Sequence, residues 1–173
     1  MTAKRIVRNF VAAALMVLAA TIGATATQDA PFGEQGRDRP DLTGSWQETV
    51  TLVGGAPFSA LLTFGEAGTL LASYQGSVIT GPFPFPASYS PGHGQWTRRR
   101  AGTFSTTVVQ MVSDLTDGHL LFINKVRQTV TIGRSGNTYR SVTRAEFYDP
   151  AGNLVFAFDG TTQGRRIGVE PLE

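Results

Sequence analysis

Polar and apolar residues alternate with a period of two along most of this chain, which is the spacing of β-strands and not of helices. From residue 42 onward no long stretch has helical spacing, so we expect little helix there. Strand-like segments cover residues 45–53, 58–64, 69–75, 94–99, 103–112, 119–132, 138–148 and 154–162. The pattern therefore predicts an all-β fold.

Short connections rich in Gly, Asn and Asp join most of these segments. Residues 65–68, 117–118, 133–137 and 149–153 supply side chains that tolerate the positive φ angles of tight turns. No connection holds a helical crossover, so consecutive strands should pair antiparallel. The sequence predicts an eight-stranded antiparallel up-and-down β-barrel, whose closure removes exposed strand edges and encloses an apolar interior.

One connection, residues 76–94, is much longer than the others. Its prolines alternate with aromatic residues: Pro82, Phe83, Pro84, Phe85, Pro86, Tyr89 and Pro91. Proline cannot donate to a strand ladder, so we expect a loop or a sheet edge. Two interpretations stay open: a rigid flap whose phenylalanines plug the barrel end, and a functional lid.

Charged residues fix which side of each strand faces the interior. In segment 119–132, Lys125 and Arg127 have the parity of solvent-facing residues, so Asn124 and Gln128 should face inward. Segment 138–148 follows the same rule, with Arg140, Arg144 and Glu146 expected outside and Tyr139 inside. The expected ligand-binding residues, taken from the inward parity and the long connection, are Phe104, Gln110, Phe122, Asn124, Gln128, Tyr139, Phe83 and Phe85.

This predicted interior combines apolar walls with a few uncharged polar groups, as small-molecule pockets do. Glu48 is the exception, because it shares the parity of Trp46 and Val50. An inward carboxyl group needs a partner or a raised pKa. Glu48 and Tyr139 are therefore the candidate catalytic residues, if the protein is an enzyme.

Gly44-Ser45-Trp46 opens the first strand, and Arg165-Arg166 lies just past the expected end of the last. Together with the strand meander, these residues resemble the lipocalin and wider calycin pattern. The resemblance implies that Trp46 packs beneath Arg165 or Arg166 at the floor of the barrel, in a cation–π contact. The chain departs from lipocalins because it has no room for a helix after the eighth strand and because its longest loop follows the third. Avidin-like and allene-oxide-cyclase-like barrels share the strand count and remain alternatives.

The N-terminal residues have the three parts of a secretory signal. Basic residues at positions 4, 5 and 8 precede an apolar run over 10–20, and Ala24-Thr25-Ala26 follows. We predict a signal peptide over 1–26 with cleavage after Ala26, a flexible polar leader over 27–41 and one barrel domain over 42–173. The mature protein should be secreted or periplasmic, without a stable membrane anchor.

Charge and composition exclude several partners. Without the signal, 12 basic residues balance 13 acidic residues, so nucleic-acid binding loses its support. The chain has no cysteine, and neither His93 nor His119 has a carboxylate at ligand spacing along the sequence. We therefore expect no metal site and no cofactor.

Three functions are compatible with these features. The sequence favours an exported barrel that binds a small, mainly hydrophobic molecule, because the predicted interior polar groups are neutral and scattered. The first alternative is an isomerase or cyclase without a metal, which confines and orients an apolar substrate. The second is a structural or interaction module with a packed interior.

Overall fold

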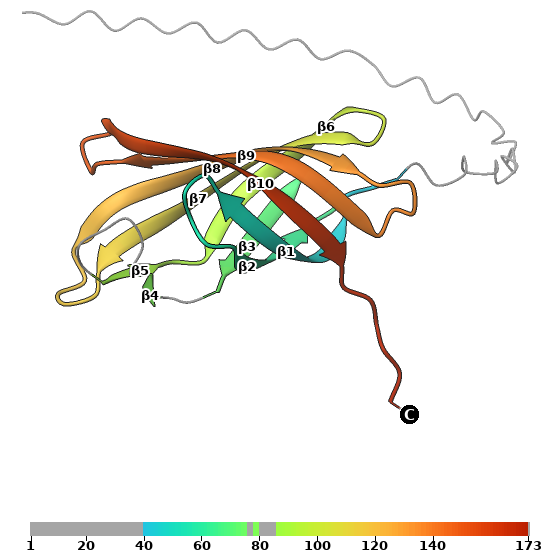
Figure 1. Cartoon of the computed structure of the whole chain (residues 1–173), viewed down its shortest axis with the longest axis horizontal. Helices are drawn as coiled ribbons and strands as arrows, with labels where there is room; N and C mark the ends of the chain where they lie inside the picture. The colour runs from blue at the N-terminus through green and yellow to red at the C-terminus, as the bar shows by residue number, and fades with distance from the viewer. Residues whose placement is uncertain (1–39, 76–77, 80–85, 173) are drawn as a thin grey trace, which may run out of the picture. The chain divides into compact units, whose positions relative to one another are not determined.

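The computed structural model describes residues 40–75, 78–79 and 86–172. Its strands are β1 (Gly44–Leu52), β2 (Phe58–Phe64), β3 (Thr69–Tyr74), β4 (Val78–Ile79), β5 (Ala87–Tyr89), β6 (Gly92–Arg100), β7 (Thr103–Asp114), β8 (Leu120–Ile132), β9 (Thr138–Tyr148) and β10 (Leu154–Arg166) (Figure 1). Within the described ranges there is no helix, and accordingly none long and apolar enough to cross a membrane.

Eight of these strands close into a barrel. The ring order is β1-β2-β3-β6-β7-β8-β9-β10, and the antiparallel pairing of β10 with β1 completes it. Every strand of the ring pairs antiparallel with both of its neighbours. The predicted all-β, eight-stranded antiparallel barrel is therefore confirmed.

The long connection between β3 and β6 contains two short strands at the edge of the sheet, which agrees with the expected loop or sheet edge, although residues 92–94 belong to β6. β5 pairs with the end of β7, and β4 pairs with β5. Pro86 and Pro91 flank β5, where the missing N–H does not interrupt its ladder. Phe83 and Phe85 lie outside the described residues. The two interpretations of this connection, a plug and a functional lid, both stay predictions.

Several strand boundaries also differ from the prediction, most of them by one or two residues. β6 begins at Gly92 and β10 extends to Arg166, four residues past its predicted end. Glycines weaken the strand pattern in both places, yet they serve close contacts between strands. A Cβ atom on Gly94 would lie 2.0 Å from the carbonyl oxygen of Thr107, so only glycine fits there.

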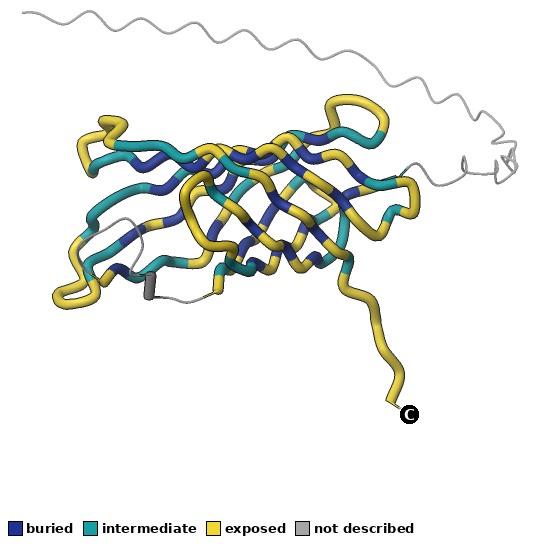
Figure 2. The backbone as a smooth tube through the Cα atoms, viewed as in Figure 1, coloured by how far each residue is buried: buried dark blue, intermediate teal, exposed yellow. Residues whose placement is uncertain are grey.

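Buried and exposed residues alternate along the strands (Figure 2). At one end of the barrel the buried side chains form an apolar layer. We call this layer the floor: Leu42, Trp46, Phe64 and Phe104, each with at most 1% of its surface exposed. The Trp46 indole N–H donates to the Leu42 carbonyl oxygen (2.8 Å). Trp96 bridges Phe64 and Phe104 with ring centroids 6.2 and 5.6 Å away, so the floor is continuous.

Arg166 covers the floor from the end of β10. It pairs opposite Trp46 in the ladder, and its guanidinium carbon lies 4.3 Å from the indole centroid. Its N–H groups donate to the carbonyl oxygens of Asp41 (2.7 Å), Gly136 (3.1 Å) and Thr43. Arg165 pairs opposite Gln47 and is exposed, so the geometry distinguishes the two arginines.

Replacing Arg166 with Met should destabilise the barrel by about 2–3 kcal/mol, because three charge-assisted hydrogen bonds and a cation–π contact are lost. Arg165→Met is the matched control and should stay within about 0.5 kcal/mol of wild type. Urea unfolding followed by circular dichroism measures both values. Equal losses in the two variants would contradict the assigned role of Arg166.

Candidate functional site

The half of the barrel away from the floor contains an interior cavity of about 380 Å³. It reaches the β1–β2 loop at Ala56 and Pro57 and is bordered by Tyr89 of β5. This volume lies within the range of about 300–1,000 Å³ that is common for small-molecule sites. Its apolar walls include Val50, Leu52, Phe58, Val126, Ala145, Phe147 and Phe158, and its polar residues include Glu48, Tyr74, Gln75, Gln110, Asn124, Gln128 and Thr143.

Strand register brings the polar residues together in pairs. Gln110 of β7 lies directly opposite Asn124 of β8, and Thr106 lies opposite Gln128. The Asn124 Nδ2 atom donates to Gln110 Oε1 (3.2 Å), and the Thr106 hydroxyl donates to Gln128 Oε1 (3.2 Å). These cross-strand bonds hold the amide side chains in fixed orientations inside the barrel.

Glu48 of β1 is the one ionisable carboxyl group among the cavity-lining residues, and only 1% of its surface is exposed. Its Oε1 atom accepts three hydrogen bonds: from the Tyr139 hydroxyl (2.8 Å), from the Thr162 hydroxyl (2.8 Å) and from Gln128 Nε2 (2.9 Å). These donors come from β9, β10 and β8, so one oxygen connects β1 to three strands. The other oxygen, Oε2, has no partner among the described residues.

Burial raises the pKa of Glu48 above its ordinary value, although the hydrogen bonds from Thr162, Tyr139 and Gln128 oppose the rise. In the part of the chain that the structure describes, Glu48 forms no salt bridge. Burial, and then the nearby Glu48, also raise the pKa values of Tyr139 and Tyr74. Burial raises the pKa of Tyr89 to about 12. The interior therefore favours a neutral carboxylic acid surrounded by neutral phenols.

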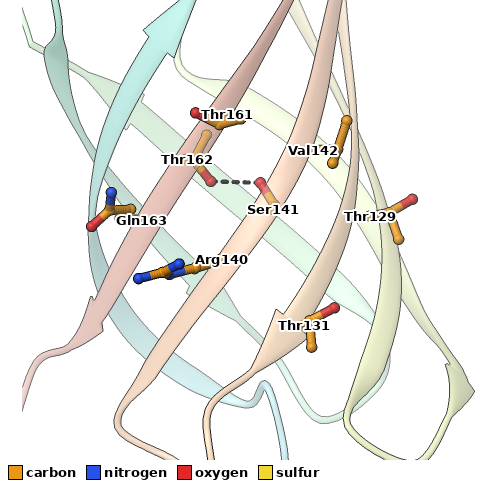
Figure 3. Close-up of a pocket in the computed structure, with 8 residues that line it drawn as sticks. All are labelled: Thr129, Thr131, Arg140, Ser141, Val142, Thr161, Thr162 and Gln163. Atoms are coloured by element: carbon orange, nitrogen blue, oxygen red, sulfur yellow. Dashed lines mark hydrogen bonds between the residues drawn. The ribbon is translucent and has the colours of Figure 1, made fainter.

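The hydroxyl network continues beyond Glu48. The Ser141 and Thr162 hydroxyl oxygens lie 2.6 Å apart, and Ser141 also contacts Thr143 (3.2 Å). Figure 3 shows this Ser141–Thr162 bond between β9 and β10. A separate hollow borders the same strands and is open to solvent; its lining includes the exposed residues Thr129, Thr131, Arg140, Val142, Thr161 and Gln163. The interior cavity is more enclosed and mainly apolar, so we place the candidate site there.

The structure brings only some of the predicted site residues together. Gln110, Asn124 and Gln128 line the cavity, and Tyr139 bonds to Glu48. Phe104 belongs to the floor and does not line the cavity.

Phe122 also does not line the cavity, although it is close to it. It contacts Phe147, which does line it, with ring centroids 6.3 Å apart, and it contacts Phe156 at 5.3 Å. Phe83 and Phe85 are outside the described residues, so their predicted contacts remain predictions.

Sequence reasoning missed Thr162 and Tyr74. Tyr74 has the same parity as the buried Leu70 and Ala72, which is a signal that the sequence contained. Thr162 was hidden because it stands between Gly160 and Gly164, where the alternation of side chains is interrupted. Tyr139 reaches Glu48 beside Gly164, where a Cβ atom would lie 2.2 Å from its ring.

Glu146 has the predicted outward parity, but it is not solvated as expected. Its side chain is only 7% exposed because Arg127, Arg144 (3.1 Å) and Tyr148 (2.9 Å) cover it. Burial alone would raise the pKa of Glu146, but these hydrogen bonds lower it below its ordinary value. Arg144 also bonds to Asp159 (2.9 Å), which makes an ionic cluster on the outside of the barrel.

The turn between β7 and β8 brings Asp114, Asp117 and His119 together, with potential ligand atoms within 4.8 Å of one another. Sequence spacing was therefore a poor guide to carboxylates near His119. The His119 ring already lies 2.5 Å from an Asp117 oxygen, and these two side chains are largely exposed. Their hydrogen bonds within the turn explain the arrangement.

Comparison of the chain with protein-family models and with curated proteins finds no match. The geometry of the site is therefore the basis for assigning its chemistry. An apolar cavity excludes water from a ligand, and fixed amides and a carboxyl group orient it through hydrogen bonds.

The raised pKa of Glu48 predicts a specific dependence of stability on pH. The folded protein holds the Glu48 proton more tightly than the unfolded chain does, so the stability that Glu48 contributes is fully present below its unfolded pKa of 4.5. As pH rises from there through the folded pKa, the Glu48 contribution should fall by about 1.4 kcal/mol per pH unit. Glu48→Gln should lose this slope.

Urea unfolding between pH 4 and pH 9 measures the slope. Glu66→Gln, in the exposed β2–β3 turn, is the matched control and should keep the wild-type slope. The same pH profile in wild type and Glu48→Gln would show that Glu48 is not buried in its neutral form.

Proposed function

We propose that this protein is an exported β-barrel that binds a small, mainly hydrophobic molecule in its interior. The observation that carries the proposal is the cavity of about 380 Å³, which is enclosed by β-strands and has mainly apolar walls. Closed barrels of eight strands either fill with side chains or hold one small ligand. The cavity favours the second outcome and argues against a module with a packed interior. Export rests on the signal-like residues 1–26.

The polar residues of the cavity support the same proposal. Gln110, Asn124 and Gln128 hold fixed orientations, so they present hydrogen-bonding groups at defined places on an apolar wall. Such sparse and rigid polar groups give a binding site specificity, whereas the apolar area supplies affinity. A resemblance to the lipocalin and calycin pattern agrees with a ligand held inside the barrel.

A second candidate function, an isomerase or cyclase acting on an apolar substrate, is favoured by Glu48. A buried carboxyl group beside an apolar cavity polarises a bound substrate, and confinement orients that substrate for reaction. Turnover of an apolar precursor that disappears in Glu48→Gln, with folding and binding retained, would establish this function. Binding without turnover supports the first proposal.

Binding is tested with N-phenyl-1-naphthylamine, a neutral dye whose fluorescence rises in apolar surroundings. The dye should bind wild type, and Ala145→Phe should weaken binding by about tenfold or more because the new ring fills the cavity. Val142→Phe is the matched control, since Val142 lies on the same strand but is 68% exposed. This variant should bind the dye within about twofold of wild type.

Absence of dye binding to wild type, or equal effects of the two substitutions, would contradict the assigned cavity. Native mass spectrometry of protein purified from its own host gives an independent measurement. A small molecule that co-purifies with wild type and is absent from Ala145→Phe supports the proposal.

A further inference from the structure

Two buried side-chain oxygens have no hydrogen-bond partner among residues 40–75, 78–79 and 86–172: Glu48 Oε2 and Asn124 Oδ1. Both residues line the same cavity, and they are 1% and 5% exposed. Buried polar atoms in proteins are nearly always paired, so each exception needs an explanation. A ligand that carries the missing partners explains both atoms at once.

The orientation of Asn124 follows from a chain of hydrogen bonds. Gln110 Nε2 donates to the backbone carbonyl oxygen of Ser90 (3.0 Å), which can only accept. Gln110 must therefore turn its own oxygen toward Asn124, which donates through Nδ2 (3.2 Å). Asn124 keeps its carbonyl oxygen for the cavity, so this oxygen calls for an O–H or N–H donor.

The state of Glu48 follows from its surroundings. Three donors already occupy Oε1, and the titratable groups that face Glu48 are Tyr139 from β9 and Tyr74 from β3. No described cation pairs with this carboxyl group, and burying an unpaired charge is costly. The neutral acid with its proton on Oε2 is the favoured form, and its O–H group calls for an acceptor.

We propose that the cavity selects a neutral, mainly apolar molecule with two polar groups: a carbonyl or ether oxygen that accepts from Glu48 Oε2, and a hydroxyl or N–H group that donates to Asn124 Oδ1. This inference rests on the proposed binding function and specifies its ligand class. Carboxylate ligands are disfavoured, because no described residue that lines the cavity is a Lys, Arg or His.

The spacing of the two anchors limits the shape of the ligand. Asn124 and Gln128, the residue that bonds to Glu48, are four positions apart on β8, which is about 13 Å along a strand. The acceptor and the donor of the ligand should therefore lie toward opposite ends of an apolar body.

Four naphthalenes of similar size test the proposal through competition with N-phenyl-1-naphthylamine. They are 2-isopropylnaphthalene, which lacks a polar group, 2-acetylnaphthalene, which has the acceptor, 6-acetyl-2-naphthol, which has acceptor and donor, and 2-naphthoate, which is anionic. The measured quantity is the ratio of dissociation constants within a pair of ligands. Comparing this ratio between variants cancels the difference in ligand hydrophobicity.

The preference for acetyl over isopropyl should drop about fivefold or more in Glu48→Leu, the size expected for one hydrogen bond. Glu48→Gln should keep the preference, since its Nε2 atom donates in place of Oε2. Asn124→Leu should keep the preference for acetyl over isopropyl, but it should lose the preference for 6-acetyl-2-naphthol over 2-acetylnaphthalene. Thr129→Leu, exposed on the outer side of β8, should match wild type for all four ligands.

The pH dependence gives a second measurement, which does not require Glu48→Leu to fold. Wild type should lose its acetyl preference as pH rises through the pKa of Glu48, whereas Glu48→Gln should keep it at every pH. If Glu48 does not donate a hydrogen bond to the ligand, the acetyl preference of the wild type should stay constant with pH. That result would overturn the inference. Tighter binding of 2-naphthoate than of 2-acetylnaphthalene would overturn it as well.

The outcomes separate this inference from the proposed function. If the dye binds wild type and the three neutral naphthalenes compete with unchanged ratios in every variant, the cavity binds apolar molecules but has no polar selectivity. If neither the dye nor any naphthalene binds, the binding function itself is wrong.

Discussion

The hydrogen bonds that meet at Glu48 Oε1 determine how the interior of this barrel is divided. They connect β1 to its ladder neighbour β10 and also to β8 and β9, with which β1 has no backbone pairing. Along β1 the inward residues change from Trp46 in the packed floor to Glu48 and then to Val50 and Leu52 in the cavity wall. Glu48 therefore lies at the boundary between the half of the barrel that provides stability and the half that is hollow.

Tyr139 can occupy its place in this network because residue 164 is a glycine. Its ring packs 4.8 Å from the Trp46 ring and lies against Gly164, where a Cβ atom would come within 2.2 Å of it. The hydroxyl then reaches Glu48 at 2.8 Å. Gly164 interrupts the alternation of side chains, yet the hydrogen bond from Tyr139 of β9 to Glu48 of β1 requires a glycine there. The pairing of β10 with β9 continues through Gly164 without a break.

The sequence predicted well which side chains face the interior, because successive residues of a strand point to only two faces and charged residues mark the outer one. Lys125 and Arg127 required Asn124 and Gln128 to face inward, and the structure buries both amides. The same reasoning could not predict how far along the barrel axis each inward side chain lies. Phe104 and Gln110 share one parity of β7, but they are six residues apart, so one lies in the floor and the other in the cavity wall.

Position along the axis depends on the stagger between strands, which is a property of the closed barrel and not of any single segment. For this reason the sequence indicated that Glu48 needs a partner but could not name Thr162, 114 residues away. The partner of β5 could not be named for a related reason: prolines indicate a loop or a sheet edge locally, whereas the strand that pairs with this edge is distant in the sequence.

The two halves of the barrel also differ in how completely their polar groups are satisfied. In the floor, the Trp46 indole and the Arg166 guanidinium bond to backbone carbonyl oxygens. In the cavity, Glu48 and Asn124 each keep one oxygen without a partner among the described residues. Unpaired buried atoms reduce stability, so a fold tolerates them where the rest of the structure is well packed. The floor provides that packing, and the two unpaired oxygens found in the described part of the chain lie beside the cavity, where the proposed ligand would supply their partners.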